Sequence, residues 1–248
     1  MKPTNKAQLE TLENEVNAEL ETIAESGTPG SEPITDGVVD IDLYLSSSPK
    51  ILWILKEPVD EVINGVPSGG GWSLTKHILA EGKFGNKPPF APMAYVAYAV
   101  FHDFPKWSGI KYVTEDLEVR ESVKRIAYIN VSKMPAHTTS GGTDLTDCYR
   151  RNRHILLKQI EGINPDIIIG GNTLRLFFAD LGINAAQFTT QGSADFCIKE
   201  NRLYIDAYHP SQWSTVDNDV YVDDIVTIIK NHSPILPPTQ TPIGNQES

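Results

Sequence analysis

The fold of this chain is indicated first by Ile51-Leu52-Trp53-Ile54-Leu55, a continuous apolar run followed by Lys56-Glu57-Pro58. Such a run, without polar alternation, is typical of a strand that is covered on both faces. Three more apolar runs predict further strands, at residues 126–129, 166–169 and 203–207. The sequence therefore predicts a sheet whose strands are buried on both sides.

Helical spacing of apolar residues separates these predicted strands. The helical patterns lie at about residues 73–82, 92–103, 143–162, 172–181 and 219–231. Strands that alternate with helices pair in parallel through right-handed crossovers. We therefore expect an α/β fold, a three-layer sandwich in which a short four-stranded parallel sheet is flanked by helices.

The two ends of the chain differ from this alternating body. Residues 6–25 place apolar side chains at spacings of three and four, which predicts an amphipathic helix. These side chains are Leu9, Leu12, Val16, Leu20 and Ile23. We expect an N-terminal helix and loop at residues 1–31, an α/β domain at 32–231, and a flexible tail rich in Pro, Thr, Asn and Gln at 232–248.

Composition limits the class of protein. The 248 residues are 40% hydrophobic and carry a formal net charge of −11, which argues against a long nucleic-acid footprint. The net charge does not exclude a local basic face, because one segment concentrates basic residues. They are Arg150, Arg151, Arg153, His154 and Lys158. We find no apolar leader and no apolar run approaching about 18 residues, so we expect a cytoplasmic protein that does not contact the membrane. No oligomeric state follows from the sequence.

We expect neither a cofactor nor a metal. Two cysteines, Cys148 and Cys197, cannot supply a four-cysteine zinc site or an iron–sulfur cluster. His77, His102 and His154 have no partner at a metal-binding spacing, and we expect Cys148 to be a buried structural thiol. The Walker loop, Gly-x-Ser-x-Gly, and a Gly-x-Gly-x-x-Gly after the first strand are all absent.

Polar segments follow each of the predicted strands. They are Lys56-Glu57-Pro58, Asn130-Val131-Ser132-Lys133, Gly170-Gly171-Asn172 and Tyr208-His209-Pro210-Ser211. Open α/β folds bind ligands at the carboxyl ends of their strands, so these segments are candidates for one site. Glu57 would position a water, or would be a solvated carboxylate at a strand end. Asn130 would recognise a base edge through its amide, or would form a turn.

A glycine-rich loop leads into the helical pattern at 73–82. Gly69-Gly70-Gly71 would let a ligand or another backbone approach closely, and the helix start would offer N–H groups to an anion. Trp72 would stack on a flat heterocycle or pack in the core. Lys133 and His137 lie in the loop after the second strand, where they would hold a phosphate or remain solvated.

The order of these segments resembles the uracil-DNA glycosylase superfamily. Three blocks within about residues 50–215 carry the resemblance. Residues 54–58 look like the strand and water-activating loop of those enzymes, and His209-Pro210-Ser211 looks like their leaving-group loop. The longest block, residues 127–171, is similar to the thermostable iron–sulfur branch. The resemblance implies a uracil-DNA glycosylase-like fold and a function in base-excision DNA repair.

The resemblance implies roles for four residues around the base. Glu57 falls where many members place the Asp or Asn that positions the hydrolytic water. Trp72 lies where a stacking aromatic is expected, and Asn130 matches the Asn that recognises the uracil edge. His209 matches the His that stabilises the charge left on the base as the glycosidic bond breaks.

The resemblance also implies contacts with DNA containing uracil or a damaged base. Ser211 would pinch a phosphate, and Gln212 or Trp213 would act as a wedge beside the flipped nucleotide. A basic strip beside the pocket would draw on Lys133, Arg150, Arg153 and the 209–213 loop.

The chain departs from the family in ways that leave two functions open. Cys148 matches one cluster ligand but the other three are absent, so no cluster is implied. Glu57 is one methylene longer than the usual Asp or Asn, and residues 32–50 have no counterpart. The first hypothesis is a glycosylase that hydrolyses the N-glycosidic bond of uracil or a related damaged base in DNA. The second is a non-catalytic protein that binds a nucleobase, a nucleotide or a partner protein on the same fold.

Overall fold

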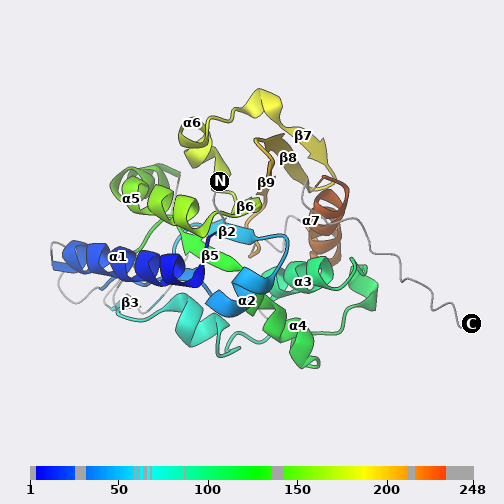
Figure 1. Cartoon of the computed structure of the whole chain (residues 1–248), viewed down its shortest axis with the longest axis horizontal. Helices are drawn as coiled ribbons and strands as arrows, with labels where there is room; N and C mark the ends of the chain where they lie inside the picture. The colour runs from blue at the N-terminus through cyan, green and yellow to red at the C-terminus, as the bar shows by residue number, and fades with distance from the viewer. Residues whose placement is uncertain are drawn as a thin grey trace, which may run out of the picture.

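The computed structural model describes residues 4–25, 32–58, 60, 62–63, 66–67, 69–86, 88–135, 142–211 and 216–232. Its centre is a mixed sheet of seven strands with helices on both faces (Figure 1). The strand order across the sheet is β1-β5-β2-β6-β9-β8-β7. The strands are β1 (Gly37–Val38), β2 (Ile51–Leu55), β5 (Ala127–Asn130), β6 (Ile167–Gly171), β7 (Thr189–Gln191), β8 (Ala194–Lys199) and β9 (Arg202–Ala207). A separate hairpin pairs β3 (Val62–Ile63) with β4 (Val66–Pro67).

The α/β class predicted from the sequence is confirmed. The four expected strands are β5, β2, β6 and β9, and each pairs in parallel with its neighbour. All five residues of β2 and of β6 are buried, as the continuous apolar runs predict. These strands form the middle of the sheet.

The expectation of a sheet with only four parallel strands is wrong, because three antiparallel strands extend it. On one side β1 pairs with β5, and on the other β8 pairs with β9 and β7 with β8. The β8–β9 hairpin turns through Glu200 and Asn201, both at positive φ (51° and 63°), which matches the twist of the flanking strands. In β8, Asp195 and Lys199 leave an apolar run of only Phe196-Cys197-Ile198, so the strand lacks the continuous apolar signal of the central strands.

Helices cover both faces of the sheet. The helical elements are α1 (Lys6–Glu25), α2 (Ile41–Ser46), the π-helix η1 (Leu74–Leu79), α3 (Phe90–Phe101), η2 (Trp107–Gly109), α4 (Leu117–Glu121), η3 (Ser122–Arg125), α5 (Gly142–Ile163), η4 (Leu174–Phe177), α6 (Phe178–Leu181), η5 (Ala185–Gln187) and α7 (Asn218–His232). One core joins the sheet to α3 and α7, and a second core joins its other face to α5 and η4. In the described part of the chain, no helix is long and apolar enough to cross a membrane.

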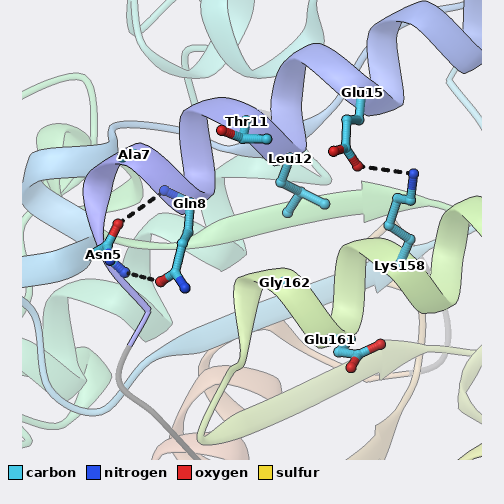
Figure 2. A pocket seen from close by; sticks show the side chains of 9 residues that line it. All are labelled: Asn5, Ala7, Gln8, Thr11, Leu12, Glu15, Lys158, Glu161 and Gly162. Atoms are coloured by element: carbon cyan, nitrogen blue, oxygen red, sulfur yellow. Dashed lines mark hydrogen bonds and ion pairs between the residues drawn. The ribbon is translucent and has the colours of Figure 1, made fainter.

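Helix α1 lies alongside α5 on the outside of the second core (Figure 1). Its predicted apolar face is buried: Leu9, Val16 and Leu20 are at most 2% exposed. A Cβ added to Gly162 of α5 would lie 2.7 Å from Leu12, so the glycine permits close packing of the two helices. Figure 2 shows the shallow groove along this contact, where Lys158 and Glu15 form an ion pair of 3.1 Å.

Candidate functional site at the carboxyl ends of the parallel strands

The polar segments predicted as one site meet at one edge of the sheet. Leu55 is the register partner of Asn130, and Gly171 is that of Ala207. Hydrogen bonds continue the ladder beyond the strands, since Ser132 N–H donates to the Lys56 carbonyl (2.8 Å) and Asn172 N–H to that of Ala207 (2.9 Å). The loops after β5, β2, β6 and β9 are therefore held side by side.

The connections after β2 and β6 leave on opposite faces of the sheet. The chain after β2 leads to α3 in one core, whereas β6 leads to η4 in the other. Between two such strands an open α/β sheet has a crevice at its carboxyl edge, which is the usual ligand site of these folds. Glu57 follows β2 at this edge of the sheet, and its side chain is half-buried.

Asn130 is 1% exposed and is fixed at both ends. Its backbone N–H donates to Oδ2 of Asp36 (2.7 Å), and its Oδ1 accepts a hydrogen bond from the hydroxyl of Tyr128 (2.8 Å). Its Nδ2 is buried and has no hydrogen-bond partner in the described part of the chain. A buried donor without an acceptor is unfavourable, so this amide has unused capacity to bind a ligand oxygen or nitrogen.

A segment without assigned role in the sequence, residues 32–36, ties Trp72 to the loop after β5. Ile34 N–H donates to the Lys133 carbonyl (2.7 Å), and Thr35 N–H donates to the Trp72 carbonyl (3.1 Å). The Trp72 ring is half-buried against the core of the α3 face, and its Nε1–H donates to Asp60 Oδ2 (2.7 Å). Sequence reasoning missed this segment because its partners lie far away along the chain.

The glycine-rich loop serves a backbone contact. Gly70 has φ +94°, and a Cβ there would lie 1.8 Å from the carbonyl oxygen of Glu32. The Gly70 N–H donates to Asp60 (2.8 Å) and the Gly71 N–H to the Pro33 carbonyl (3.1 Å). Of the two predicted uses of these glycines, the structure therefore supports close approach of another backbone.

The side chain of Lys133, predicted to contact DNA, is 0% exposed. The Nζ lies 2.7 Å from Oδ1 of Asp36 and 2.8 Å from Oε1 of Gln159. Burial lowers the pKa of Lys133 and the carboxylate of Asp36 opposes that shift. Lys133 is thus part of the buried network that also holds the Asn130 backbone through Asp36.

His209 follows β9 and is half-buried. Its Nδ1 accepts a hydrogen bond from Ser211 N–H (3.2 Å), which leaves the ring proton on Nε2. Burial, and then the charge of Lys56, lower the pKa of His209 from 6.5 to about 4. The imidazole is therefore neutral near pH 7 and can donate a hydrogen bond through Nε2.

Gly171 allows the His209 loop to pack onto the sheet edge. A Cβ on Gly171 would lie 2.4 Å from Leu55 Cδ2, 3.2 Å from Pro210 Cδ and 3.4 Å from His209 Cα. The absence of a side chain at 171 thus brings the end of β2 and the His209 loop together.

The other residues predicted to contact DNA differ in exposure and in their partners. Arg150 and Arg153 are exposed on α5, but Arg150 pairs with Asp147 (2.8 Å) and Arg153 Nε with Asp180 (2.9 Å). Ser211 is exposed beside His209. Gln212 and Trp213 lie outside the described residues, as does His137. The basic strip expected from the sequence is reduced to two arginines that already contact carboxylates.

A cavity of about 480 Å³ opens on the α5 side of the same edge, and Asn172 and Tyr208 from two of the predicted polar segments line it in part. Arg175 Nε binds Asp206 Oδ2 (3.0 Å) in this cavity, and Asp195 is the cross-strand neighbour of Asp206. Burial raises the pKa of Asp206, and Arg175 opposes the shift. Tyr208, 39% exposed, lines the cavity next to His209.

Cys148 differs from its prediction as a buried thiol. It is half-buried on α5, where its sulfur accepts a hydrogen bond from Arg151 (3.2 Å), whereas Cys197 is the buried cysteine. Burial raises the pKa of Cys197 to about 11. Among the described residues, no group of three or more His, Cys, Asp or Glu side chains is placed to bind a metal ion.

Comparison of the chain with protein-family models and with curated proteins finds no match. The functional argument therefore depends on the fold and on the geometry of this edge.

Proposed function

We propose that the protein is a DNA glycosylase of the uracil-DNA glycosylase type, which hydrolyses the N-glycosidic bond of uracil or a related damaged base. We further propose that β5, β2, β6 and β9 correspond to the four-stranded parallel sheet of that superfamily. One observation carries the proposal. Asn130, whose buried Nδ2 has no partner among the described residues, ends one of four parallel strands whose carboxyl ends also present Glu57 and a neutral His209.

The residues have complementary chemical roles in this proposal. The base flips out of the DNA and lies between the Trp72 ring and the amide of Asn130. Glu57 accepts a proton from a water whose oxygen attacks C1′ of the sugar, and the bond from C1′ to the base breaks. The bonding electrons leave with the base as an anion, and the Nε2–H of His209 donates a hydrogen bond to its oxygen.

Neutral His209 suits this role for an electrostatic reason. Its lowered pKa keeps it from becoming an imidazolium in the empty site, so no buried charge has to be neutralised before the substrate binds. The hydrogen bond strengthens as negative charge develops on the base, which favours the transition state over the ground state. The nearby charge of Lys56 also favours an anion there.

The test is a cleavage assay on a fluorescent oligonucleotide that carries one uracil, in single-stranded, paired and mismatched forms. Alkali then breaks the strand wherever the base has been removed. The proposal predicts cleavage by the wild type and a loss of at least about 100-fold in His209→Ala. His102→Ala is the matched control, since His102 is also half-buried but stacks on Tyr98 and binds Glu118. Equal activity of His209→Ala and wild type would refute the assignment.

A second candidate is a non-catalytic protein that binds a nucleobase, a nucleotide or a partner protein. The state of the basic side chains that were predicted to contact DNA favours it. Lys133 is buried, and Arg150 and Arg153 are paired with carboxylates, so all three predicted cationic contacts with DNA are engaged within the protein. Binding to uracil-containing DNA at several salt concentrations distinguishes the two candidates. A glycosylase should show affinity that falls with salt, whereas absence of salt-sensitive binding supports the second candidate.

A further inference from the structure

We propose that Tyr128 is a positioning residue that orients the amide of Asn130, so that this site takes bases with a carbonyl oxygen and rejects bases with an amino group at the same place. The inference rests on the proposed function in taking Asn130 as the base contact.

Tyr128 is placed by the strand itself. It lies two residues before Asn130 on β5, so both side chains project from the same face of the sheet. Tyr128 is 2% exposed, and its ring packs edge-to-face on Phe90 with the ring centres 6.0 Å apart. Its hydroxyl therefore has a fixed position from which it contacts Asn130 Oδ1 at 2.8 Å.

The hydroxyl of Tyr128 is the donor in this hydrogen bond. Burial, with the charges of Asp36 and Glu57, raises the pKa of Tyr128 well above its usual range, so the hydroxyl keeps its proton. A protonated hydroxyl that donates to Oδ1 holds the oxygen of the amide towards Tyr128. The Nδ2 group then occupies the other side, where it is buried and has no partner within the described residues.

The backbone of Asn130 is held as firmly as its side chain. Asp36 accepts the Asn130 N–H through Oδ2, and Lys133 and Gln159 both donate to Asp36. The amide can neither move away along the strand nor rotate without losing a hydrogen bond. Asn130 thus presents a fixed donor to whatever enters the site.

A fixed donor separates bases into two chemical classes. A carbonyl oxygen, as at position 4 of uracil, accepts the hydrogen bond from Nδ2. An exocyclic amino group, as at the same position of cytosine, directs N–H against N–H and leaves both donors unpaired. A site built to hydrogen-bond one group discriminates strongly against an analogue that leaves its buried polar atoms without partners.

The experiment measures the affinity of the full chain for free uracil and for free cytosine by calorimetry. The signal of the Asn130 side-chain amide in NMR spectra reports binding at this residue. We expect wild type to bind uracil at least about tenfold more tightly than cytosine. In Tyr128→Phe the core contacts remain but the amide is free to rotate, so the ratio should fall about tenfold.

Tyr44→Phe is the matched control, because it also removes a buried tyrosine hydroxyl, one that donates to the Ile163 carbonyl (3.3 Å) outside this site. Its ratio should equal that of wild type. A merely structural loss in Tyr128→Phe would weaken both bases equally and leave the ratio unchanged, and that result overturns the inference. Wild type that binds neither base, or prefers cytosine, also overturns it.

The base-binding ratio tests the inference, and the DNA cleavage assay tests the proposed function, so the two results are independent. A protein that shows the Tyr128-dependent ratio but does not cleave DNA keeps the inference and supports the non-catalytic candidate. A protein that excises uracil with an unchanged ratio in Tyr128→Phe keeps the proposed function and loses the inference.

Discussion

Protonation of His209 is expected to destabilise the folded protein in mildly acidic solution, and a His209→Gln variant measures this effect. Burial and Lys56 lower the pKa of His209 in the fold from 6.5 to about 4. The neutral ring is thus favoured by folding, while the unfolded chain takes up a proton more readily. The stability that follows is fully present above pH 6.5 and is lost as the pH falls towards 4.

The size of the effect follows from the two pKa values. Each pKa unit corresponds to about 1.4 kcal/mol. The interval from 6.5 to about 4 therefore amounts to about 3 kcal/mol once the pH is below both values. At pH 5 the unfolded state is almost fully protonated at this residue and the folded state only about one tenth, so about 2 kcal/mol is already lost.

Urea unfolding of wild type and His209→Gln at pH 8 and pH 5 isolates this contribution. Other titrating groups act in both proteins and cancel in the difference of differences. We expect wild type to lose about 2 kcal/mol more than the variant between the two pH values, a midpoint shift of about 1 M urea. His102→Gln reports how much of the change follows from removal of a half-buried histidine elsewhere.

An NMR titration of His209 gives the second measurement. The ring proton signal of His209 should titrate with a midpoint near 4, well below the 6.5 of an exposed histidine. A midpoint near 6.5 together with a difference of differences under about 0.5 kcal/mol would refute the reasoning. It would also remove the argument that His209 enters catalysis as a neutral donor.

Three further predictions concern the support of the site and its surface. Asp36→Asn leaves the Lys133 ammonium buried without its carboxylate, and the free energy of unfolding in urea should fall by about 3–5 kcal/mol. Gly70→Ala forces a side chain into φ +94° and against Glu32. It should therefore lower the free energy of unfolding, measured by thermal denaturation, by about 2 kcal/mol or more. Gly109→Ala, where the added Cβ meets nothing within 4 Å, should change it by less than about 1 kcal/mol. If Arg150 and Arg153 do contact phosphates, replacing both with Ala should lower the slope of log affinity against log salt by about 2.

The central strands were predictable because their signal is local. The apolar runs at 51–55 and 203–207 need no partner to be recognised, and they correspond to β2 and to most of β9. Strand β8 was missed because Asp195 limits its apolar run to Phe196, Cys197 and Ile198, and β1 because two residues carry no periodicity. Their place in the sheet depends on neighbours that the sequence does not identify.

The burial of Lys133 shows the limit of local reasoning most clearly. A lysine in a loop is usually exposed, and nothing beside it in the sequence suggests otherwise. Its counter-charge, Asp36, lies 97 residues earlier, and Gln159 lies 26 residues later on α5. Only the fold brings a carboxylate and an amide to the same ammonium, and only then does the lysine become a buried support.

The same network explains why the motifs alone do not define this site. The sequence predicts Asn130 as a base contact from its residue type at a strand end. The chemistry that it offers depends on which edge of its amide is free. Tyr128 holds Oδ1 and Asp36 holds the backbone N–H, so the free group is the Nδ2 donor. Because Asp36 also neutralises Lys133, one carboxylate couples the stability of the core to the orientation of Asn130. A substitution at Asp36 should therefore weaken base recognition although Asp36 does not contact the base. The loss should be larger for substitutions that leave the Asn130 N–H without its hydrogen bond.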